Sequence, residues 1–103
     1  MKTECLYILG KLYTIKRVPR AEFGSGSDAT CHFYDHTIRL RDDLCEQASI
    51  DSALHEGLHV IAQSLGVDLE ENEVCALTAG FYALIADNPE FIDEVVRASE
   101  PIC

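Results

Sequence analysis

The chain has 103 residues, of which 48% are hydrophobic and 25% are charged, and its formal net charge is −10 at pH 7. This length and composition are typical of one soluble globular domain, which we expect to span residues 1–103. The acidic balance argues against nucleic acid or an anionic membrane as a direct partner, because phosphate contacts need a basic face. The sequence has no transmembrane stretch and no signal peptide, so a cytoplasmic location is the default expectation.

The first part of the chain is expected to form a small sheet. Four segments rich in β-branched and aromatic residues predict strands, at residues 5–9, 12–18, 31–34 and 38–41. Gly10-Lys11 predicts a two-residue turn. Residues 20–30, which contain the Gly24-Ser25-Gly26-Ser27 run, are expected to form a flexible loop. The region 31–41 is our candidate for an exposed edge that binds an extended peptide by strand addition. His36 in its turn is either a solvent-exposed turn residue or a contact to substrate or oxyanion.

Helical periodicity begins at about residue 50. The apolar positions Leu54, Leu58, Ile61 and Leu65 predict a buried stripe on a helix over about 50–65. Ser49 or Asp51 is the expected N-cap, and Gly66 is expected just past the last turn.

Two further helices are expected after Gly66. Asp68 as N-cap and Glu71 three residues later predict a capping box at the start of the second. Its inward-facing apolar residues are expected to be Val74, Leu77, Phe81, Leu84 and Ile85. Asn88-Pro89 ends this helix and opens a short third one. Strands followed by helices predict an α+β fold, with a small antiparallel sheet packed on two to three helices.

The most informative motif is H-E-x-x-H, formed by His55, Glu56 and His59 inside the first predicted helix. Side chains four residues apart share one helix face, so both imidazoles can reach one zinc ion. Glu56 projects to one side, where it can act as the general base toward a water held by the metal. The alternative is an ordinary exposed His-Glu-His cluster. Gly57 inside the motif indicates either a close approach by another backbone or a tolerated helix defect.

A catalytic zinc site needs a third protein ligand. Glu73 is the acid least explained by helix chemistry and is expected to face the first helix, so we predict that it completes the site. Glu70 is the alternative, as is a site without a Glu ligand. Glu71 is assigned to capping.

The five cysteines, Cys5, Cys31, Cys45, Cys75 and Cys103, form no C-x-x-C pair and are expected to be reduced thiols. Cys75 is expected to fill part of the core or a half-buried position beside it. Cys103 could reach a metal if the tail folded back, although a frayed terminus is the ordinary interpretation.

The order of strands, H-E-x-x-H and a following Glu helix resembles the gluzincin class of zinc peptidases. At this length the chain looks like a minigluzincin, similar to small proteins of phages and mobile elements. More faintly, it resembles the repressor-cleaving peptidases of the ImmA/IrrE type. The likeness covers nearly the whole chain and is carried by residues 34–40, 54–59 and 73–89.

This resemblance implies a zincin-like minimal catalytic domain, in which His55, His59 and Glu73 bind one Zn²⁺. Glu56 would polarise the water and pass its proton to the leaving amine of a peptide or protein substrate. No Tyr or His matches the family's oxyanion group, and no C-terminal subdomain is expected, so the enzyme would be latent or narrowly specific. The alternative function is a zinc-binding protein-interaction module with weak or no catalysis. The sequence leaves the oligomeric state open.

Overall fold

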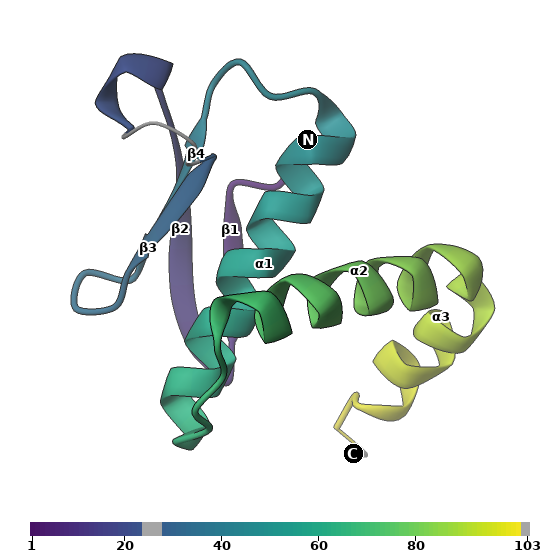
Figure 1. Ribbon diagram of the computed structural model, residues 1–103. Coiled ribbons are helices and arrows are strands. Elements are labelled where there is room, and N and C mark those ends of the chain that lie inside the picture. The colour runs from purple at the N-terminus through teal and green to yellow at the C-terminus, as the bar shows by residue number, and fades with distance from the viewer. Residues whose placement is uncertain (24–27, 102–103) are drawn as a thin grey trace.

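A computed structural model describes residues 1–23 and 28–101. The Gly-Ser run 24–27 and Cys103 therefore lie outside the described residues. The elements follow in the order β1 (Cys5–Ile8), β2 (Lys11–Val18), a 3-10 turn η1 (Arg20–Glu22), β3 (Ala29–His32), β4 (Thr37–Arg41), α1 (Glu46–Leu65), α2 (Glu71–Asp87) and α3 (Pro89–Ala98). The sheet comes first and the helices follow, which confirms the predicted α+β class (Figure 1).

The sheet is mixed, with strand order β1-β2-β4-β3. β1 pairs with β2 and β3 pairs with β4 in antiparallel fashion, whereas β2 and β4 run parallel. The prediction of a purely antiparallel sheet is therefore wrong for the central pair. After Pro19 the chain crosses to the edge of the sheet opposite β1, where it forms β3. The β3–β4 hairpin then places β4 between β3 and β2. As a result β3, and not β4, forms the edge on that side.

Helix α1 packs on one face of the sheet through small side chains. Its buried residues include Ser49, Ala53, Gly57 and Val60. Ala53 and Val60 belong to the core cluster that also contains Ile8, Tyr13, Ile15, Ile38 and Leu40. The predicted stripe of larger residues lies beside this face, because Leu54, Leu58 and Ile61 are only half-buried and Leu65 is exposed. The buried face thus contains Glu56, a carboxylate in an otherwise apolar and small-residue surface.

One of the two predicted ends of α1 agrees with the structure. The helix begins at Glu46 after Cys45, four residues before the expected start, and Ser49 is inside it, accepting a 2.9 Å hydrogen bond from Arg17 Nη1. Gly66 ends the helix in the left-handed conformation, with φ of 69°, as predicted.

Helices α2 and α3 extend away from the sheet (Figure 1). Only Val74 and Thr78 of α2 are buried, while the expected inward residues Leu77, Phe81, Leu84 and Ile85 are 40–47% exposed. α2 ends at Asp87 and Pro89 is the first residue of α3, as predicted. Among the described residues, no helix is long and apolar enough to cross a membrane.

Candidate metal centre

His55 and His59 lie on the same side of α1, one turn apart, as the motif requires. Their Nε2 atoms are 3.2 Å apart, and the rings meet edge to face with centroids separated by 4.9 Å. Both side chains are partly shielded, with exposed fractions of 19% and 28%. The helix therefore directs two imidazole nitrogens to one point at its surface.

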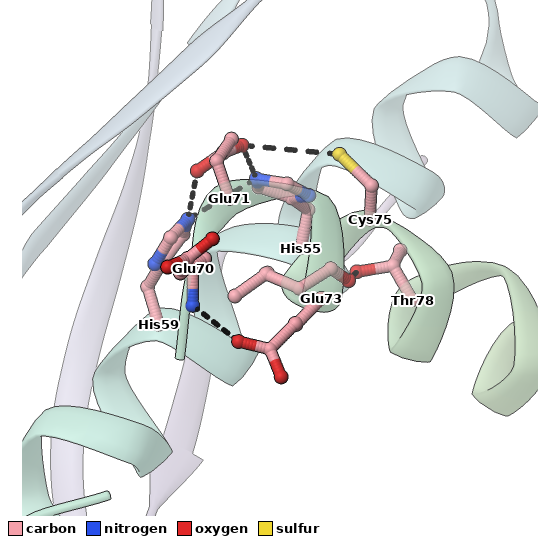
Figure 2. Close-up of polar contacts among 8 residues, drawn as sticks. His55, His59, Glu70, Glu71, Glu73, Cys75 and Thr78 are labelled. Carbon is pink, nitrogen blue, oxygen red and sulfur yellow. Dashed lines mark hydrogen bonds and ion pairs between the residues drawn. The ribbon is translucent and has the colours of Figure 1, made fainter. Parts of the chain in front are cut away.

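Glu71, the first residue of α2, adds a carboxylate to these two imidazoles. Its Oε1 lies 2.7 Å from His55 Nε2 and its Oε2 lies 2.9 Å from His59 Nε2 (Figure 2). The left-handed Gly66 ends α1, and the short connection to Glu71 brings the start of α2 back over the histidines. Burial of Val74 and Thr78 holds α2 there. His55, His59 and Glu71 thus form a group whose ligand atoms lie within 4.8 Å of one another.

Glu73 does not reach the imidazoles. Its Oε1 accepts a 2.9 Å hydrogen bond from the backbone N–H of Glu70 (Figure 2). The Glu70 side chain accepts one from the backbone N–H of Glu73 in return. This is a capping box, and it begins two residues later than the predicted box of Asp68 and Glu71, which is wrong. The shift reverses the two expected roles: Glu73 caps the helix, whereas Glu71 is free of capping and faces the histidines. Glu70, the sequence alternative, is the N-cap itself.

The group fits a zinc ion by chemistry and spacing. Ligand atoms of a tetrahedral zinc, at roughly 2.0–2.1 Å from the metal, lie about 3.3 Å from one another. Here the two imidazole nitrogens are 3.2 Å apart, each lies within 3 Å of a different Glu71 oxygen, and one ligand atom from each residue lies within 4.8 Å of the others. A small movement of the exposed Glu71 side chain would make room for the ion. Two imidazoles and one carboxylate are also the set that leaves a fourth zinc position for water.

Glu56 lies beside the group and is 7% exposed. The Cys31 thiol of β3 lies beside it. Burial, the negative charge of Glu56 and hydrogen bonding to that carboxylate together raise the pKa of the Cys31 thiol to about 12. Cys31 is therefore a neutral thiol next to the Glu56 carboxylate.

Two clefts meet at Glu56 and Glu71. The larger, of about 620 Å³, runs beside β3 toward the end of α1 and includes Cys31, Phe33 and His59 in its wall. The smaller, of about 280 Å³, lies on the other side and includes His55 and Cys75. Acidic side chains line both, which favours a cation at the point where the clefts meet.

Cys75 is exposed, so the prediction that it fills the core is wrong. It lies one turn after Glu71, and its Sγ is 3.9 Å from Glu71 Oε1 (Figure 2). The cysteines Cys5, Cys31, Cys45 and Cys75 are all free, as expected of reduced thiols. His36 is remote from both clefts: it is half-buried in its turn, with φ of 52°, and stacks on Tyr13 at 4.7 Å.

Comparisons of the chain with models of protein families, with curated proteins and with solved structures find no match. The interpretation of the centre therefore depends on its residues. Sequence reasoning found His55, His59 and Glu56, and it named Glu71 only as a capping residue. A signal for Glu71 was present, because a helix that starts with Glu70-Glu71-Asn72-Glu73 offers a second capping register, and that register leaves Glu71 unassigned.

Proposed function

We propose that the protein is a zinc-dependent metallopeptidase in which His55, His59 and Glu71 bind one Zn²⁺ and Glu56 is the general base. The observation that carries the proposal is the meeting of two histidine nitrogens and the Glu71 carboxylate directly beside a buried Glu of the same helix. When bound, zinc polarises a scissile carbonyl and lowers the pKa of an attacking water.

Glu56 has the surroundings that this role requires. Its carboxylate borders both clefts, so it can accept a proton from a water and deliver it to a leaving amine on either side. The neutral Cys31 thiol lies beside this carboxylate, on the side of β3.

The edge strand β3 supports an extended peptide as the substrate. The N–H of Arg41 donates to the carbonyl of Asp28, so alternate residues Asp28, Thr30 and His32 direct their backbone groups toward β4. The backbone N–H and C=O of Cys31 then point away from the sheet, at the rim of the larger cleft. A peptide added along this edge would pass beside Glu56.

The test is Glu56→Gln, because it keeps the shape of the side chain and removes the base. We expect the variant to bind zinc like the wild type and to lose cleavage of a library of unstructured peptides, measured by mass spectrometry. Glu46→Gln, an exposed acid at the start of the same helix, is the matched control and should cleave normally.

Two results would contradict the proposal. Cleavage by Glu56→Gln at the wild-type rate would remove Glu56 from the chemistry. A fully zinc-loaded wild type that cleaves no peptide of the library would favour the alternative, a zinc-binding protein-interaction module built on the same site.

A further inference from the structure

Cys75 lies next to the candidate metal centre, and the proposed function does not use it. It is on α2, one turn after Glu71, just as His59 is one turn after His55 on α1. Side chains four residues apart share one face of a helix, and α1 packs against α2, so each helix presents one such pair to the same region. The two pairs offer two imidazoles, a carboxylate and a thiol, which are all zinc ligands.

The distance from Cys75 to Glu71 is close to the one that a shared zinc ion requires. Cys75 Sγ lies 3.9 Å from Glu71 Oε1, the same oxygen that lies 2.7 Å from His55 Nε2. In a tetrahedral site, a sulfur at about 2.3 Å and an oxygen at about 2.1 Å from zinc are about 3.6 Å apart. Figure 2 shows the thiol directed toward the Glu71 carboxylate, on the side of His55.

The thiol has to turn further toward the imidazoles to bind the same ion. The group of ligand atoms within 4.8 Å of one another contains His55, His59 and Glu71 but not Cys75. The Cys75 side chain is exposed, so it can rotate about its Cα–Cβ bond without disturbing the core. The rotation leaves the thiol in the smaller cleft, which Cys75 lines together with His55, Glu56 and Glu71. Among the described residues, no Lys or Arg lines this cleft to repel a metal ion.

We propose that Cys75 is the fourth zinc ligand of the resting protein and regulates the peptidase by occupying the position that the attacking water needs. The inference rests on the proposed function, because a zinc ion at His55, His59 and Glu71 is its premise. A zinc site with four protein ligands is closed, whereas a catalytic site keeps one position for water. Thiol and water therefore compete for one position, and the wild type cleaves slowly because the thiol occupies it most of the time.

Loading with Co²⁺ in place of zinc tests the ligand without measuring activity. A thiolate bound to Co²⁺ gives an intense charge-transfer absorption band in the near ultraviolet, which imidazole and carboxylate ligands do not give. We expect this band in the Co²⁺-loaded wild type and its loss in Cys75→Ser. Cys5→Ser, at an exposed cysteine of β1, is the matched control and should keep the band. Both positions are exposed, so both variants should fold, and circular dichroism checks this.

Zinc affinity gives a second measurement on the same proteins. Loss of an outer hydrogen-bond partner of a metal ligand already weakens binding by about 10–100-fold, so loss of a ligand should weaken it at least about tenfold. We expect this fall in Cys75→Ser and unchanged affinity in Cys5→Ser. Bound Co²⁺ without the band in the wild type, a band that persists in Cys75→Ser, or equal zinc affinity in both proteins would overturn the inference.

Cleavage rates separate this inference from the proposed function. At full zinc occupancy we expect Cys75→Ser to cleave peptides faster than the wild type, because the fourth position is then open to water. Equal rates in the two proteins would overturn the regulatory role of Cys75 while leaving the peptidase intact. A band that depends on Cys75, with no cleavage by either protein, would support Cys75 as a ligand and contradict the peptidase function. A wild type that binds neither zinc nor Co²⁺ would overturn both.

Discussion

The Glu73 carboxylate accepts a 2.9 Å hydrogen bond from the backbone N–H of Glu70, and this bond decides which acid faces His55 and His59. With Glu73 engaged at the third position of α2, Glu71 at the first position is directed at the two imidazoles. The capping box and the candidate metal centre are thus parts of one arrangement. Glu73 caps the first turn of α2, and Glu71, two residues earlier, is directed at the histidines of α1.

Replacing Glu73 by Ala should destabilise the protein without removing the metal. Loss of a cap typically costs about 1 kcal/mol, which lowers the melting temperature of a domain of this size by roughly 4–8 °C. Asn72→Ala, an exposed neighbour outside the box, is the control and should change the melting temperature little. Thermal unfolding and zinc content measure the two effects. Loss of zinc in Glu73→Ala with an unchanged melting temperature would indicate that Glu73 is a metal ligand and not a cap.

Replacing Gly57 by Ala should stabilise the protein. A Cβ at this position would lie 3.9 Å from Ile8 Cδ1, an ordinary van der Waals contact, so no close backbone approach requires glycine here. The gain in helix propensity is about 0.5–1 kcal/mol. Gly80→Ala, where a Cβ meets open space, should show the same gain, and Gly66→Ala at φ 69° should destabilise. Denaturant unfolding that shows a loss for Gly57→Ala would indicate a tighter α1–sheet contact than the one described.

Cys31 should resist alkylation at pH 8, where exposed thiols react. Its pKa is raised to about 12 by burial and by the Glu56 carboxylate, so the reactive thiolate is scarce until the pH approaches that value. In Glu56→Gln the nearby charge is removed, the pKa falls toward its ordinary value, and labelling at pH 9 should become faster. Mass spectrometry of each cysteine measures this, with exposed Cys5 and Cys45 as internal references. Equal labelling of Cys31 in both proteins would contradict the Cys31–Glu56 contact.

Zinc occupancy should fall as the pH is lowered from about 8 to 5, because a protonated imidazole cannot bind a metal. The direction follows from competition, because protons and metal ions bind to the same imidazole nitrogens. Metal analysis after dialysis at fixed free zinc would show the loss. Full occupancy at pH 5 would mean that the metal is held by other groups.

The sequence was informative wherever a local rule governs the structure. The H-E-x-x-H spacing needs only a helix to bring His55 and His59 together, and Gly66 and Pro89 mark helix ends through their own backbone preferences. The class of the fold followed from the order of strands and helices. These predictions depend on residues within a few positions of one another.

The sequence misled where two local solutions compete or where packing decides. Asp68 and Glu70 can both start a capping box, and the structure uses the later one, so Glu71 and Glu73 exchange their expected roles. The buried face of α1 contains the small residues Ser49, Ala53 and Gly57 and not the predicted stripe of larger residues, because packing on the sheet, and not the apolar periodicity alone, decides which face is buried. The parallel pairing of β2 with β4 depends on a crossover that no local pattern encodes.

The central claim is that Glu71 holds the metal together with the two histidines, and the zinc content of the purified protein tests it most directly. Metal analysis should give about one zinc per wild-type chain and a sharp fall in Glu71→Ala and in His55→Ala, with zinc retained in Glu73→Ala. A wild type without zinc, or a Glu71→Ala variant that keeps it, would contradict the account.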